Sequence, residues 1–170
     1  AGLNRVNISL NTLKKEKYAV ITDSHCFENV WLGVEEALKV GLRPVKLNVV
    51  VMKGINDDEI LDFVQLAVRY PLCVRFIEFF PANGRSGKLI HLIMDNIEVK
   101  DKIKKHFDGM TMVDGTKGNG PAEYFKLKDS QGSLGFISGS SSNFCDRCNR
   151  VRVDCTGRVS PCLFSEHLCD

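Results

Sequence analysis

The chain has 170 residues, of which 44% are hydrophobic and 26% are charged, and its formal net charge is +2. These proportions are ordinary for a globular protein with a sizeable hydrophobic core, and they exclude intrinsic disorder. The small net charge excludes a strongly basic nucleic-acid binder. No apolar run reaches the roughly 18 residues of a membrane span, and no basic-then-apolar leader opens the chain, so we expect a cytoplasmic location.

The first half of the chain alternates between strand and helix patterns. Residues 5–11 and 45–52 alternate with a period of two, and residues 73–80 form a third apolar run, so each is predicted to be a strand. Two helices are predicted between them, one ending at Gly41 and one with Asn56 as its N-cap. The order strand, helix, strand, helix, strand predicts right-handed crossovers and a parallel sheet.

Polar side chains are predicted to share one face of this sheet. Helices cover the other face, which must be apolar, so Lys46 and Asn48 of the second strand and Ser9 of the first strand point away from the helices. This pattern fits a barrel lumen that holds a polar ligand, and it fits equally well a sheet whose open face is wetted by solvent.

A second and less regular unit is expected from residue 96 onward. The chain is therefore divided into units 1–95 and 96–170. The second unit contains a predicted amphipathic helix over residues 97–107 and two short strands over residues 124–127 and 134–138, joined by a turn.

Cysteines are concentrated near the end of the chain: five of the seven lie between Cys145 and Cys169. Cys145 and Cys148 form a C-x2-C pair, which offers two sulfurs to one metal centre, and Cys162 is a remote third ligand. An odd number of clustered cysteines disfavours a disulfide framework. Structural zinc with His167 or Cys169 as the fourth ligand and an iron–sulfur cluster on three cysteines both remain open, and spacing alone favours zinc.

Arginines overlap this cysteine cluster: Arg147, Arg150, Arg152 and Arg158. In a strand after Cys148, Arg150 and Arg152 share a face, and guanidinium groups pair bidentately with phosphate or carboxylate. A closed zinc site does not need such a pair of arginines. The pair therefore favours an iron–sulfur cluster with one open iron and a nucleotide bound nearby. A solvated, charged hairpin is the alternative.

Residues 136–164, FISGSSSNFCDRCNRVRVDCTGRVSPCLF, resemble the cluster motif of the molybdenum cofactor biosynthesis protein A family, the GTP 3′,8-cyclases of the radical S-adenosylmethionine superfamily. NRVNISLNTL, GLRPVKLNVVVMKGIND and RFIEFFP resemble barrel strands of that family in the same order. The resemblance implies an α/β fold: the second half of an incomplete (βα)6 TIM-like barrel, followed by an α+β iron–sulfur cluster region.

The resemblance also implies roles for particular residues. Cys145, Cys148 and Cys162 match the ligands of a 4Fe–4S cluster that meets GTP, whereas Cys155 and Cys169 match no ligand. The residues that it implies bind GTP are all basic: Lys46, Arg75, Arg150 and Arg152. Of these, Arg150 and Arg152 are implied to be needed for turnover and so to be catalytic.

Two positions are implied to contact S-adenosylmethionine, namely Ser9 and Phe80. The family typically has Met where Phe80 stands. In a regular strand, Arg75 and Phe80 lie on opposite faces, unless the strand bulges or ends between them.

The C-x3-C-x2-C motif of the radical-generating cluster is absent, because Ser141 stands four residues before Cys145. The chain is therefore expected to be a fragment of a lyase that converts GTP to (8S)-3′,8-cyclo-7,8-dihydroguanosine 5′-triphosphate, and to be inactive alone. Its expected partners are GTP, S-adenosylmethionine and the missing N-terminal half of the barrel with a second 4Fe–4S cluster. Neither nucleic acid nor membrane is expected, and a homodimer is compatible with the sequence. A zinc-stabilised binding module and another radical S-adenosylmethionine enzyme with an auxiliary cluster are the alternatives.

Overall fold

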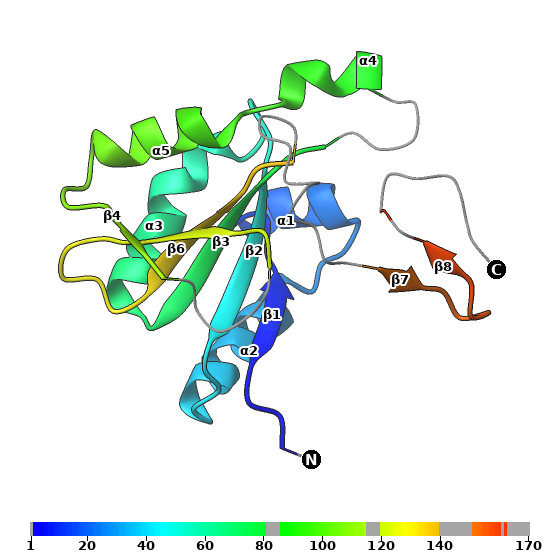
Figure 1. The fold of residues 1–170 in the computed structure, drawn as a ribbon, viewed down its shortest axis with the longest axis horizontal. Coiled ribbons are helices and arrows are strands. Elements are labelled where there is room, and N and C mark those ends of the chain that lie inside the picture. The colour runs from blue at the N-terminus through cyan, green and yellow to red at the C-terminus, as the bar shows by residue number, and fades with distance from the viewer. Residues whose placement is uncertain (1, 81–85, 115–119, 140–150, 161, 163–170) are drawn as a thin grey trace.

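The computed structural model of the chain describes residues 2–80, 86–114, 120–139, 151–160 and 162. The strands are β1 (Val6–Ser9), β2 (Val45–Val51), β3 (Leu72–Glu78), β4 (Thr111–Val113), β5 (Glu123–Lys126), β6 (Ser133–Ile137), β7 (Arg152–Val153) and β8 (Val159–Ser160). A six-stranded sheet has the order β1-β2-β3-β6-β5-β4, and β7 pairs with β8 in a separate two-stranded sheet. Figure 1 shows this hairpin clear of the larger sheet.

The helices are α1 (Lys15–Thr22), α2 (Phe27–Lys39), α3 (Ile60–Arg69), α4 (Ser86–Leu89) and α5 (Asn96–Lys104), with short 3-10 turns η1 (Asp57–Glu59) and η2 (Ile90–Leu92). Helix α2 contacts β2, and α3 contacts β3, β6 and α5 (Figure 1). None of the helices described is long and apolar enough to cross a bilayer.

The sheet joins both halves of the chain. Strands β1, β2, β3 and β6 are parallel neighbours, which confirms the predicted parallel sheet, and β5 and β4 extend it in antiparallel fashion. Strand β6 pairs with β3 in a register that places Gly135 opposite Arg75 and Phe136 opposite Phe76. One sheet therefore contains strands from before and after the expected boundary at residue 96.

The sheet face that the helices cover is apolar. Val45, Leu47, Val49 and Val51 alternate toward it along β2, and none is more than 2% exposed. Phe76 and Phe136, from the paired strands β3 and β6, stack there with ring centroids 5.8 Å apart. Helix α3 adds its buried residues to the same core: Ile60, Phe63, Val64 and Ala67. Full burial of each large apolar side chain contributes roughly 1.5–3 kcal/mol.

Local sequence patterns predict some of the helices and miss others. Helix α2 ends as predicted at a glycine: Gly41 has φ +78°, and the next amide, of Leu42, donates to Ala37 O at 3.0 Å. Helix α1 was not predicted, because its only buried residue is Tyr18 and apolar periodicity is therefore weak. The run Asn83-Gly84-Arg85-Ser86-Gly87 is typical of a loop, but helix α4 begins at Ser86, which corrects that expectation for its last two residues.

Gly132 docks the turn before β6 onto the end of α3. Its amide donates to Ala67 O at 2.8 Å, and the amide of Gln131 donates to Val68 O at 3.1 Å. A Cβ atom at Gly132 would lie 2.0 Å from Leu72 O and 2.7 Å from Tyr70 O. Both are backbone atoms, so the turn has no room for a side chain.

We expect Gly132→Ala to lower the free energy of unfolding by about 2–4 kcal/mol, because the new methyl group forces the turn away from the backbone that connects α3 to β3. Gly33→Ala is the matched control: it lies within α2, and a Cβ there would meet nothing within 4 Å. That variant should be neutral or up to about 1 kcal/mol more stable. Urea denaturation followed by far-UV circular dichroism measures both, and equal midpoints for the two variants would contradict the expected clash.

Candidate functional site

Polar side chains occupy the sheet face opposite the helices. The register pairs Ser9 with Asn48, Asn48 with Arg75, and Arg75 with Gly135 across β1, β2, β3 and β6. Residues two apart on a strand share a face, so Lys46 lies beside Asn48 on this same surface. The alternate side chains of β2 belong to the core. Ser9, Lys46 and Asn48 therefore share the non-helical face, as their alternation predicts.

Arg75 lies across this face and is only 9% exposed. Its Nε donates to Asn48 Oδ1 at 2.8 Å, and its Nη2 donates to Asn7 Oδ1 at 3.1 Å. On the other side, a Cβ atom at Gly135 would lie 2.8 Å from Arg75 Cγ. The arginine side chain therefore needs glycine on the neighbouring strand, and it reaches from β3 over β2 to β1.

Lys46 is the second buried cation of this face and is 7% exposed. Its Nζ lies 3.5 Å from the hydroxyl oxygen of Tyr124 and 5.6 Å from the centre of the same ring. Tyr124 is itself buried and belongs to β5, in the antiparallel part of the sheet. The phenol thus offers Lys46 a hydrogen-bond acceptor and a π face.

Neither of these cations has a carboxylate partner among the residues that the structure describes. The lysines that do form ion pairs lie at the surface, and even the least exposed of them, Lys100, has a side chain that is 20% exposed. Desolvating a cation without a counter-ion is costly. Lys46 and Arg75 therefore make this face suitable for an anionic ligand that carries more than one charge.

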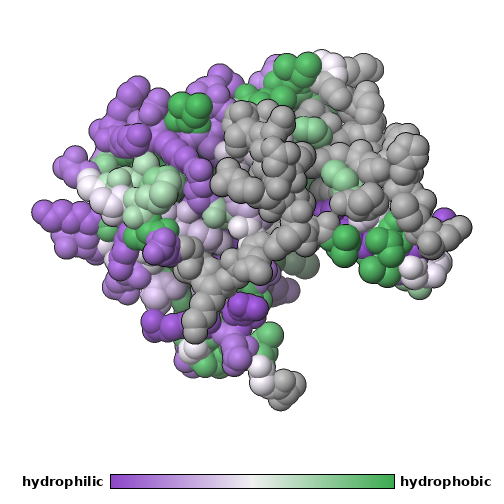
Figure 2. Space-filling view, viewed as in Figure 1, coloured by the Kyte–Doolittle hydropathy of each residue, from purple (hydrophilic) through white to green (hydrophobic). Residues whose placement is uncertain are grey.

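The other described residues that are expected to bind ligands lie near the ends of strands or in the β7–β8 hairpin. Ser9 is the exposed last residue of β1, and Phe80, 40% exposed, follows β3. Since β3 ends at Glu78, the parity argument that separated Phe80 from Arg75 no longer applies. Arg152 is exposed on β7. Figure 2 shows hydrophobic residues gathered over this hairpin.

Of the three expected cluster ligands, Cys162 is among the described residues. Cys145, Cys148 and Arg150, with the alternative zinc ligands His167 and Cys169, lie outside the described residues. Cys162 is described: it is exposed just beyond β8, and its carbonyl oxygen accepts a hydrogen bond from the Ser160 hydroxyl at 2.8 Å. The described part of the chain contains no group of three potential metal ligands.

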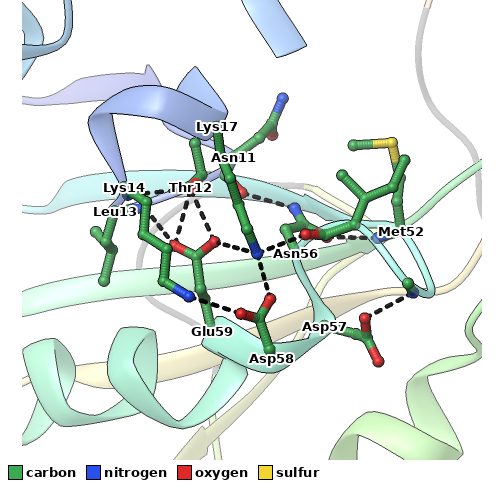
Figure 3. Close-up of polar contacts among 12 residues, drawn as sticks. Asn11, Thr12, Leu13, Lys14, Lys17, Met52, Asn56, Asp57, Asp58 and Glu59 are labelled. Carbon is green, nitrogen blue, oxygen red and sulfur yellow. Dashed lines mark hydrogen bonds and ion pairs between the residues drawn. The ribbon is translucent and has the colours of Figure 1, made fainter. Parts of the chain in front are cut away.

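A buried carboxylate anchors the loop that follows β1 (Figure 3). Glu59 is fully buried, and both of its oxygens lie 2.8 Å from the Thr12 hydroxyl. The amide of Leu13 donates to Glu59 Oε2 at 2.6 Å, and Lys17 Nζ lies 3.2 Å from Oε1. Glu59 follows Asp57 and Asp58 in the acidic first turn of η1, and it is buried there. A helix-start pattern does not reveal a partner 47 residues away.

Two asparagines connect the ends of β1 and β2 (Figure 3). Asn11 Oδ1 accepts from the amide of Val50 at 2.9 Å. Asn56 Nδ2 donates to Asn11 O at 2.6 Å, and Asn56 Oδ1 accepts from the amide of Met52 at 2.7 Å. Asn56 is the N-cap residue of η1, as predicted, but its side chain makes no cap hydrogen bond. The two carboxamides fix the strand ends beside Ser9.

Asp58 adds a charged contact at the surface of this network. Hydrogen bonds from Lys14 and then from Lys17 lower its pKa to about 2. A carboxyl group whose pKa is lower in the folded state stabilises the fold above its ordinary pKa, near 3.9, and that contribution is lost as the pH falls toward about 2. The side chain is 51% exposed, so solvent screening keeps the contribution small.

Family comparisons agree with the motifs in the sequence. Residues 72–170 match the family model for Molybdenum Cofactor Synthesis C, and residues 1–67 match that for the Radical SAM superfamily. The chain belongs to the Molybdenum Cofactor Synthesis C family. The resemblance inferred from the cysteine and strand motifs is therefore confirmed.

Similar curated proteins carry the name GTP 3′,8-cyclase. That of Moorella thermoacetica is 46% identical over 164 residues, which cover 96% of this chain and 50% of that protein. That of Heliobacterium modesticaldum is 42% identical over 172 residues, covering 100% of this chain and 52% of that protein. The chain spans about half the length of the curated relatives it matches.

We expect Thr12→Val to lower the free energy of unfolding by about 1–3 kcal/mol, because it removes a hydroxyl donor from the buried Glu59 carboxylate while keeping the side-chain volume. Thr111→Val is the control, since Thr111 is exposed on β4, and it should change the free energy by no more than about 0.5 kcal/mol. Urea denaturation measures both. An unchanged midpoint for Thr12→Val would show that its hydroxyl contributes nothing to holding Glu59.

Proposed function

We propose that this chain provides the GTP-binding part of a GTP 3′,8-cyclase, a lyase of molybdenum cofactor biosynthesis. The reaction converts GTP to (8S)-3′,8-cyclo-7,8-dihydroguanosine 5′-triphosphate with S-adenosylmethionine as the second substrate. The observation that carries the proposal is the pair of buried cations, Lys46 and Arg75, which lack carboxylate partners among the described residues. The names of the similar curated proteins agree with it.

Lys46 and Arg75 are proposed to bind the triphosphate group of GTP. A triphosphate carries several negative charges, which compensate two cations that are otherwise desolvated on the sheet face. Arg150 and Arg152 are proposed to contact GTP from the C-terminal region and to be needed for turnover. Local cations of this kind bind a strongly charged substrate although the net charge of the chain is only +2.

Ser9 and Phe80 are proposed to contact S-adenosylmethionine. Both stand at the carboxyl ends of parallel strands, β1 and β3, which is where ligands bind in α/β folds. Ser9 offers a hydroxyl group and Phe80 an apolar ring. We further propose that other strands continue the sheet beyond β1 to form a (βα)6 barrel, with units 1–95 and 96–170 as its second half and its cluster region.

Cys145, Cys148 and Cys162 are proposed to hold a 4Fe–4S cluster. Thiolates are the ordinary ligands of such clusters, and Cys162 is exposed at the end of the β7–β8 hairpin, so its sulfur suits a ligand role. When bound, the cluster would offer an open iron to the guanine base. The residues of this chain bind and orient the nucleotide.

The test of GTP binding compares two arginine variants of the complete gene product. Arg75→Ala removes charge-assisted hydrogen bonds to phosphate and is expected to weaken GTP binding by about 10- to 100-fold. Arg69→Ala, in the exposed last turn of α3, is expected to leave the affinity within about twofold. Isothermal titration calorimetry under anaerobic conditions measures both. Failure of the unaltered protein to bind GTP would contradict the proposed function.

The cluster is tested by metal and sulfide analysis after anaerobic purification. Cys162→Ser should reduce iron and acid-labile sulfide by about four atoms each per chain, because a thiolate ligand is lost. Cys155→Ser is the matched control, since Cys155 is exposed in the same hairpin and should retain the full content. If the analysis finds zinc in stoichiometric amount and no sulfide, the cluster proposal is wrong and the site is a structural zinc site.

A further inference from the structure

The two buried cations of the sheet face differ from the ion-paired lysines in the kind of partner that holds them. Arg75 donates to the carboxamide oxygens of Asn48 and Asn7, at 2.8 and 3.1 Å. Lys46 approaches the neutral hydroxyl of Tyr124, at 3.5 Å. By contrast, the lysines that form ion pairs have acidic partners: Lys14, Lys15, Lys17, Lys39, Lys53 and Lys100.

A neutral acceptor has a different electrostatic effect from a carboxylate. Both can fix the direction of a guanidinium group through a hydrogen bond, but a carboxylate also cancels its charge. An asparagine oxygen holds the group in place and leaves its charge available to a ligand. Asparagine and aspartate have almost the same shape, so the choice between them at these positions decides the charge of the site and not its geometry.

We propose that Asn48 and Asn7 are positioning residues that hold the Arg75 guanidinium for a polyphosphate while leaving its charge uncancelled. This inference rests on the proposed function. The three residues come from β3, β2 and β1, so the guanidinium crosses two strand boundaries. The hydrogen bonds to Asn48 and Asn7 occupy one N–H each of Nε and Nη2, and the remaining N–H groups are left for phosphate oxygens.

Gly135 makes this arrangement sterically feasible. A Cβ atom there would lie 2.8 Å from Arg75 Cγ, so the arginine side chain would have to shift. The same Cβ would lie 3.2 Å from Cε1 of Tyr124, the residue that holds Lys46. One glycine therefore leaves space for both Arg75 and Tyr124.

The test replaces carboxamides by carboxylates in the complete gene product. Asn48→Asp keeps the acceptor for Arg75 but adds a negative charge, and it should weaken the binding of GTP and of inorganic tripolyphosphate about tenfold, or about 1.4 kcal/mol. Asn7→Asp should weaken both about threefold, because Asn7 is exposed and its charge is screened. Asn29→Asp, on the exposed surface of α2, changes the net charge equally and should have no effect.

Guanosine separates a charge effect from a structural one. A loss of structure would weaken guanosine and GTP equally, whereas the added charge should weaken only the phosphate-bearing ligands. Thermal unfolding checks that each variant is folded, and Asn7→Asp provides the test if Asn48→Asp does not fold, because its GTP and tripolyphosphate affinities are measured in the same way. Unchanged tripolyphosphate and GTP affinities in the folded aspartate variants would overturn the inference.

Arg75→Ala distinguishes failure of this inference from failure of the proposed function. If Arg75→Ala weakens GTP binding and the aspartate variants do not, the proposed function stands and the role of the asparagines is refuted. If Arg75→Ala has no effect, GTP binds elsewhere, and both the role of Arg75 and the inference are overturned. If the unaltered protein binds neither GTP nor tripolyphosphate, the proposed function fails together with the inference.

Discussion

The pairing of β3 with β6 is the interaction on which the rest of the molecule depends. It is parallel, it joins strands that are distant in the sequence, and it continues the core through the stacked rings of Phe76 and Phe136. The same register sets Gly135 beside Arg75 on the opposite face. Strand β5, which pairs with β6, then brings Tyr124 within reach of Lys46. Core and candidate site therefore depend on one strand pairing.

Electrostatics divide the surface into two kinds of region. Around α1 and η1, lysines and acids pair, and the Lys14–Asp58 contact at 2.7 Å is typical of a solvated surface. On the open face of the sheet, the cations are buried and only neutral groups hold them. Paired surface charges contribute little to stability. Unpaired buried charges reduce stability in the absence of a ligand, and this cost is offset when an anion binds.

Local alternation in the sequence predicts much of the fold, and partners remote in the sequence explain what it misses. Period-two patterns predict the strands and place Lys46 and Ser9 on one face, because alternation is a property of neighbouring residues. They do not predict that Glu59 is buried against Thr12, or that Arg75 reaches Asn7, because both contacts depend on strand register. Asn56 follows the same logic: its local context predicts the N-cap position, but it does not reveal that the carboxamide connects the ends of two strands.

The turn at Gly132 has a consequence for the motions of the protein. Its amide and that of Gln131 satisfy carbonyl groups at the end of α3, so β6 cannot separate from the sheet without exposing the end of that helix. Helix α3 in turn buries Phe63 in the core. These elements should therefore open as one cooperative unit, with amide hydrogens that exchange together and slowly. Arg75 lies on β3, which pairs with β6, so the strand that carries it should open only together with this unit.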